Sequence, residues 1–132
     1  MIFDTSTVLK ILKDEKFLES LKISEEVKIT SITVYELLRG ASYIKLVQHS
    51  DKEINVILKL ISELNVLPFT EEDARIASAI WAKLKKEGKT VSDADVLIAS
   101  ICINNNERLV TLDTDFLKVK EVCKEFKVEI AR

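Results

Sequence analysis

Four acidic residues from separate parts of the chain could together hold a divalent cation: Asp4, Glu36, Asp95 and Asp113. Three of them lie in otherwise apolar surroundings, where a lone charge is costly unless it is neutralised. Carboxylate oxygens suit Mg²⁺ and Mn²⁺, whereas zinc prefers His or Cys, and the only histidine, His49, has no partner at ligand spacing. A cation held in this way can activate a water for in-line attack on a phosphodiester.

Each acid also has a local explanation as a helix cap. The segments Ser92–Asp95, Thr33–Glu36 and Thr70–Asp73 match the capping box, in which a Ser or Thr and an acid three residues later bond the first backbone N–H groups of a helix. Asp4 and Asp113 could cap the helices that follow their strands. Taken singly, capping is the better interpretation of the acids in the first two segments. It is the only interpretation of the third.

Short segments typical of β-strands alternate with longer helical segments. Apolar residues at positions i, i+3, i+4 and i+7 predict amphipathic helices over Val34–Ala41 and Ala77–Leu84. Val96–Ile103 is apolar all round, as expected of a helix buried within a domain. The alternation predicts a parallel sheet with helices on both faces. The predicted strands are Met1–Asp4, Val27–Ser31, Asn65–Phe69, Arg108–Leu112 and Lys127–Ile130.

The acids fall where these elements would bring them together. Asp4 ends the first strand and Asp113 follows the fourth. Asp93 and Asp95 open the buried helix, and Glu36 lies early in the helix after the second strand. Open α/β sheets bind ligands beyond the carboxyl ends of their strands. Capping does not explain why acids from four segments collect at this edge, whereas a shared cation does.

Composition limits the class of protein. The 132 residues are 47% hydrophobic and 32% charged, which is typical of one globular domain. No apolar run could span a membrane and no secretory signal is visible, so we expect a cytoplasmic protein without membrane contact. Cys102 and Cys123 are interpreted as reduced thiols. A net charge of −2 is not the basic footprint of a protein that coats a duplex, although bound metal would offset the charge of a nuclease site.

Other sites that handle phosphate do not fit the sequence. A phosphatase of the haloacid dehalogenase type needs a second Asp where Ser6 stands. A receiver domain needs an acceptor Asp after the third strand, where this chain has Leu67, Pro68 and Phe69. No glycine-rich phosphate loop and no Ser-His-Asp arrangement is present. A single histidine also excludes RNA cleavage by two imidazoles.

Four motifs in order resemble those of PIN-domain ribonucleases, specifically the small VapC-type toxins of prokaryotic toxin–antitoxin pairs. They are FDTST with Asp4, ELLRG with Glu36, DVLIA with Asp95 and TLDTDF with Asp113. Each motif alone is weak evidence, but together they extend over the whole chain. No acidic position departs from the family pattern.

The resemblance implies one PIN domain over residues 1–132, an α/β three-layer sandwich with parallel strands in the order 3-2-1-4-5. It implies an endoribonuclease that depends on Mg²⁺ or Mn²⁺ and is inhibited by a cognate antitoxin. The four acids named first would hold the metal and act in catalysis, with Asp93 and Asp115 as further candidate ligands. Thr111 and Ser6 would orient a carboxylate.

Two further interpretations remain open in the sequence. Arg39 shares a helical face with Glu36, so it could contact an RNA phosphate or form an i+3 ion pair with that acid. A catalytically inactive PIN-fold module that acts through protein or nucleic-acid contacts is the alternative function, and the complete set of acids favours the enzyme. A homodimer is expected from the resemblance and from a crowded apolar segment containing Tyr43, Ile44, Leu46 and Val47.

Overall fold

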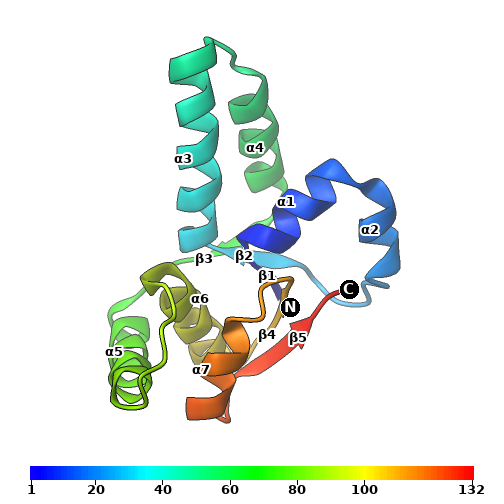
Figure 1. Cartoon of the computed structure of the whole chain (residues 1–132). Coiled ribbons are helices and arrows are strands. Elements are labelled where there is room, and N and C mark those ends of the chain that lie inside the picture. Colours follow the sequence, from blue (N-terminus) through cyan, green and yellow to red (C-terminus); the bar gives the residue numbers. More distant parts are fainter.

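A parallel sheet lies at the centre of the computed structural model, which describes all 132 residues. Its five strands follow the predicted order β3-β2-β1-β4-β5. The strands are β1 (Ile2–Phe3), β2 (Lys28–Thr30), β3 (Asn65–Leu67), β4 (Arg108–Thr111) and β5 (Lys127–Ile130). The helices, on both faces of the sheet (Figure 1), are α1 (Thr5–Lys13), α2 (Glu15–Ser20), α3 (Ser31–Gln48), α4 (Lys52–Glu63), α5 (Glu71–Lys86), α6 (Asp93–Asn104) and α7 (Phe116–Val122).

The two faces of the sheet bury separate sets of apolar side chains, because successive strand residues point to opposite sides. Ile2 and Leu109 belong to the cluster formed with α5, α6 and α7. Phe3 and Val110 belong to the cluster formed with the first four helices. The predicted three-layer α/β architecture is therefore confirmed. Helix α6 is buried from residue 98 to 102, as its apolar sequence predicts.

Four of the five strands end one or two residues earlier than their sequence patterns predict. β1 ends at Phe3 because Asp4 caps α1, accepting the backbone N–H of Thr7 at 3.1 Å. β2 ends before α3, which Thr30 caps by accepting the N–H of Thr33 at 3.2 Å. Since Thr33 lies inside α3, the predicted capping box from Thr33 to Glu36 is wrong.

Of the other two predicted capping boxes, one forms in full and the other forms only its Ser92 cap. Thr70 and Asp73 make both reciprocal hydrogen bonds of the capping box at the start of α5. Ser92 caps α6 by accepting the backbone N–H of Asp95 at 3.2 Å. That bond uses the backbone of Asp95 and not its carboxylate, so the cap alone does not account for the acidic side chain.

Helices α3 and α4 form a pair that extends away from the sheet (Figure 1). On α3, Tyr43, Leu46 and Val47 are 66%, 76% and 54% exposed. Trp81, predicted on the apolar face of α5, is 50% exposed because it lies at the margin of that face, beside Lys85. None of the helices combines the length and the hydropathy needed to cross a membrane.

Candidate active site

Asp4 carries a densely hydrogen-bonded carboxylate at the carboxyl edge of the sheet, and the residue is 3% exposed. Its Oδ1 accepts the backbone N–H of Thr7 at 3.1 Å, and its Oδ2 accepts the hydroxyl of Thr111 at 2.6 Å. The Ser6 hydroxyl lies 2.9 Å from both carboxylate oxygens. These donors offset the cost of burying the charge and fix its orientation.

The chain that leaves β4 orients two of these hydroxyls. The backbone N–H of Leu112 donates to Ser6 Oγ at 3.2 Å, and that of Asp113 donates to Thr111 Oγ1 at 3.0 Å. A hydroxyl that accepts from a backbone N–H keeps its own proton for donation. Ser6 and Thr111 therefore direct their protons to Asp4, which is the carboxylate that these two hydroxyls contact.

Glu36 faces the same edge from the second turn of α3. Its Oε1 accepts the hydroxyl of Thr5 at 2.7 Å, and its Oε2 lies 3.6 Å from Nη2 of Arg39. The i+3 ion pair between Arg39 and Glu36 is thus present. Thr5 was missed in the sequence analysis, although its position directly after Asp4, at the start of a helix, is a usable signal. It links Glu36 to the segment that carries Asp4.

The pKa of Asp95 indicates that the acids share one electrostatic environment. It is raised to about 6, first by burial and next by the negative charge of Asp113. Ser92 partly offsets this increase, and the charges of Asp4 and Glu36 add to it. Like charges raise a carboxyl pKa appreciably only when they are close. The carboxylate of Asp95 therefore lies within electrostatic range of Asp113, Asp4 and Glu36, which come from three other segments.

Asp113, Asp115 and Asp93 have different surroundings. The Oδ1 of Asp113 accepts the N–H of Asp115 at 2.9 Å, so this carboxylate closes the turn before α7, and the N-cap position of that helix falls to Asp115. Asp115 pairs with Lys118 at 3.1 Å. Asp93 is exposed and lines a separate cavity of about 200 Å³ that also includes Trp81.

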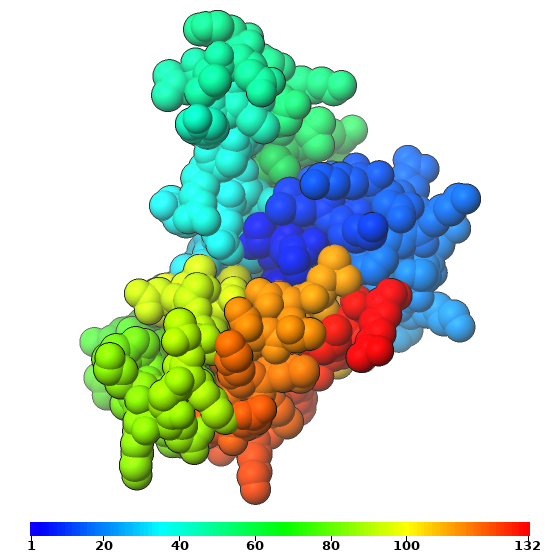
Figure 2. Space-filling model, in the orientation of Figure 1, coloured from blue at the N-terminus to red at the C-terminus, as the bar shows by residue number.

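The chemistry of the donor set fits Mg²⁺ or Mn²⁺, since every candidate ligand is a carboxylate oxygen. No group of three His, Cys, Asp or Glu side chains is already gathered closely enough to hold a metal ion. Repulsion among like charges opposes a tighter grouping. Ligation would thus require the candidate carboxylates to come closer together than they lie here. The segments that carry the four acids, coloured dark blue, cyan, yellow and orange, meet in one region of the surface (Figure 2).

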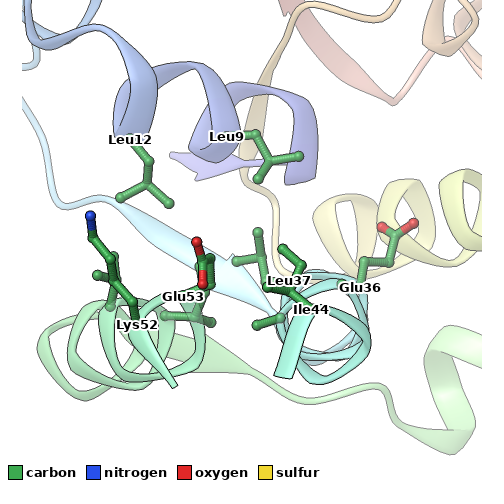
Figure 3. A pocket seen from close by; sticks show the side chains of 11 residues that line it. Leu9, Leu12, Glu36, Leu37, Ile44, Lys52 and Glu53 are labelled. Atoms are coloured by element: carbon green, nitrogen blue, oxygen red, sulfur yellow. The ribbon is translucent and has the colours of Figure 1, made fainter. Parts of the chain in front are cut away.

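An apolar groove of about 320 Å³ begins beside the acidic site, between α1, α3 and α4. Figure 3 shows Glu36 at one end of this groove and Lys52 at the other, with Leu9 and Leu12 of α1 opposite α3 and α4. Glu53 points into the groove, and its Oε2 is enclosed without any hydrogen-bond partner. Glu36 therefore belongs to two regions of different chemistry.

Comparison with known proteins identifies the family. The family model described as the PIN domain matches residues 1–122. The chain belongs to the PIN-domain family. A PIN-domain relative named Ribonuclease VapC3, from Methanocaldococcus jannaschii, is 39% identical over 100 residues, which cover 76% of this chain and 95% of that protein.

Solved structures share the PIN fold over nearly the whole chain. The crystal structure of DNA-bound VapBC from Salmonella typhimurium gives a TM-score of 0.83 at 24% identity, covering 99% of this chain and 97% of that one. VapBC-5 from Mycobacterium tuberculosis, a member of the VapBC family of toxin–antitoxin systems, gives 0.73 at 23% identity, with 99% and 96% coverage. At these identities the likeness establishes the fold.

Proposed function

We propose that this chain is a Mg²⁺- or Mn²⁺-dependent endoribonuclease and the toxin of a toxin–antitoxin pair. The observation that carries the proposal is the buried Asp4 carboxylate at the carboxyl edge of the sheet, which Ser6, Thr7 and Thr111 hold in place, with the charges of Asp4, Glu36 and Asp113 all acting on Asp95. The family supports the reaction class, since a relative is named a ribonuclease. It also supports the biological setting, since a structural neighbour is a toxin–antitoxin complex.

A divalent cation bound by Asp4, Glu36, Asp95 and Asp113 would supply an activated water and polarise the phosphodiester. Within the chain, Asp4 is the fixed point of the site, because Thr7, Thr111 and Ser6 restrain both of its oxygens. Burial and the charge of Asp113 raise the pKa of Asp95 to about 6 in the absence of metal, and a bound cation would favour its ionised form.

Mapping the ends of cleaved RNA tests the proposed reaction. Purified protein in Mg²⁺ or Mn²⁺ should cut single-stranded RNA to leave 5′-phosphate and 3′-hydroxyl ends, because an activated water replaces the ribose 2′-hydroxyl as nucleophile. EDTA should abolish cleavage. Products ending in a 2′,3′-cyclic phosphate would contradict the mechanism. Binding of RNA or protein without any cleavage would favour the catalytically inactive PIN-fold module instead.

We infer that the antitoxin binds the groove between α1, α3 and α4. Three apolar side chains that line the groove are partly exposed: Leu9 (41%), Leu12 (40%) and Val56 (45%). Together they form an apolar surface suited to the apolar face of an amphipathic helix. The enclosed oxygen of Glu53 calls for a Lys or Arg on that helix, because an unpaired buried carboxylate oxygen is costly. Since Glu36 lines the same groove, an occupant there would restrict access to the acidic site.

A homodimer is the second association that we propose. The outer part of α3 exposes Tyr43, Leu46 and Val47, and such a grouping of large apolar side chains is typical of a protein–protein contact. Ile44 is half-buried and lines the groove, so it faces away from this exposed strip. Light scattering at high protein concentration tests the proposal, and a monomer would contradict it.

A further inference from the structure

An exposed aromatic side chain stands directly beside the acidic site. Tyr35 precedes Glu36 in α3 and is 60% exposed. The guanidinium carbon of Arg39 lies over its ring, 5.3 Å from the ring centroid. Because Nη2 of Arg39 is also 3.6 Å from Oε2 of Glu36, the guanidinium connects the aromatic ring to one of the four acids.

The ordinary explanation of this pair is stabilisation of the helix surface. An exposed cation–π contact and an i,i+3 ion pair each stabilise a helix surface to a modest extent. This explanation does not depend on where the ring lies, so it gives no reason for an exposed ring next to a residue of the acidic site. The two explanations differ in a measurable way, because only a role in binding makes Tyr35 matter to RNA.

Electrostatics gives RNA little help on this protein. The chain has a net charge of −2, and its acidic site concentrates negative charge where a phosphate must approach. Affinity must therefore come partly from contacts other than phosphate pairing. Unpaired nucleotides supply such contacts by stacking their bases on aromatic rings and on Arg guanidinium planes.

We propose that Tyr35 is a positioning residue that stacks a base of single-stranded RNA beside the acidic site, while Arg39 contacts an adjacent phosphate. This inference rests on the proposed ribonuclease function and names the substrate feature that the site accepts, an unpaired nucleotide. Stacking tolerates any base, because every base presents a π-face. Tyr35 therefore favours unpaired over paired RNA and discriminates little between sequences.

A second aromatic–cation pair provides an internal control. Trp81 is 50% exposed, and Nζ of Lys85 lies 6.0 Å from its ring centroid, again with a spacing of i,i+4. This pair is on α5, which packs on the opposite face of the sheet from α3. Trp81→Ala thus removes an aromatic ring that is also at least half exposed, from a place where the proposal assigns it no role.

RNA binding by full-length variants tests the proposal. Fluorescence anisotropy with a labelled, random-sequence 20-nucleotide single-stranded RNA gives the Kd, in an Asp4→Asn background that prevents cleavage. Tyr35→Ala should raise the Kd by about tenfold or more, whereas Tyr35→Phe should retain the parent value. Trp81→Ala should leave the Kd unchanged. Arg39→Gln should reduce the slope of log Kd against log salt concentration by about the amount expected for one lost phosphate contact. Tyr35→Ala should not change that slope.

The outcomes separate this inference from the function on which it rests. A parent protein that cleaves and binds RNA, together with a Tyr35→Ala variant of unchanged Kd, overturns the stacking role alone. Equal losses in the Tyr35→Ala and Trp81→Ala variants also overturn it, because the effect would then be general. A parent protein that neither cleaves nor binds RNA overturns both proposals. A lower Tm without a change in Kd identifies the helix-surface explanation as the correct one.

Discussion

The acidic site and the apolar groove share Glu36, but they differ in the hydrogen-bond donors that surround their buried carboxylates. The oxygens of Asp4 are surrounded by hydroxyl and N–H donors, whereas Oε2 of Glu53 has no donor at all. In the acidic site the remaining costs are burial and repulsion among the charges. In the groove the cost is one desolvated oxygen that lacks a donor. A divalent cation in the acidic site, and a Lys or Arg on an apolar partner in the groove, would relieve these two costs.

The largest expected effect is on RNA cleavage, from substitution of Asp4, the most firmly held carboxylate of the acidic site. Asp4→Asn replaces a carboxylate oxygen with an amide nitrogen, which coordinates metal poorly. It should lower the rate of RNA cleavage by about a hundredfold or more, beyond the tenfold to hundredfold loss typical of residues that only support a ligand. Asp14→Asn is the matched control, because Asp14 also caps a helix, and its cleavage rate should be normal. Wild-type cleavage by Asp4→Asn would show that the site is assigned wrongly.

A smaller loss is expected from the residue that orients Asp4. Thr111→Val keeps the shape of a fully buried side chain but removes the hydroxyl that donates to Asp4 at 2.6 Å. Cleavage should fall by about tenfold to a hundredfold. A steady-state assay at several metal concentrations measures this loss, and extra Mn²⁺ should recover part of it. A loss that metal does not influence would contradict an orienting role.

The sequence predicted this contrast only in part. The parallel sheet and the acidic edge followed from periodicity and from acids at strand ends, which are local patterns, whereas the strand order came from the family resemblance. The hydroxyl of Thr5 was missed, because its place directly after Asp4 marks it as a candidate but nothing local shows that it reaches Glu36 on a separate helix. Glu53 was missed for a related reason. Its enclosure depends on α1, which is distant in sequence from α4, and no local spacing reports that contact.

Removing the unpartnered oxygen in the groove should stabilise the isolated chain. Glu53→Leu replaces a desolvated carboxylate with an apolar side chain, and the free energy of unfolding should rise by about 1 kcal/mol. Glu72→Leu is the matched control, because Glu72 occupies the same second position of its helix but is exposed. That variant should be neutral or slightly less stable, since it loses only the favourable interaction with the helix N-terminus. Urea titrations compare the two variants. Equal changes in the free energy of unfolding would contradict the cost assigned to the desolvated oxygen of Glu53.

Relief of charge repulsion should have a comparable effect in the acidic site. Asp113→Asn removes the charge that contributes most, after burial, to the raised pKa of Asp95. In EDTA the variant should be more stable than the parent by about 1 kcal/mol. Millimolar Mn²⁺ should stabilise the parent and have much less effect on the variant. Asp115→Asn, whose acid pairs with Lys118, should respond to Mn²⁺ as the parent does. Thermal melts without this pattern would indicate four unrelated acids.

The smallest expected effect is a dependence of stability on pH that comes from Asp95. Its folded-state pKa of about 6 lies above its ordinary value of 3.8. Between these values the folded protein binds a proton that the unfolded chain does not, so its stability in EDTA should rise as pH falls from 7 to 5.

Glu107 has the opposite effect on stability, and only at lower pH. Burial raises its pKa, but the hydrogen bond from Lys28 contributes to a net decrease below 4.5, so its stabilisation is lost as pH falls further. Urea titrations at pH 5, 6 and 7 therefore isolate Asp95, and Asp95→Asn should abolish the rise. A parent protein whose stability falls over this range would contradict the shared anionic site.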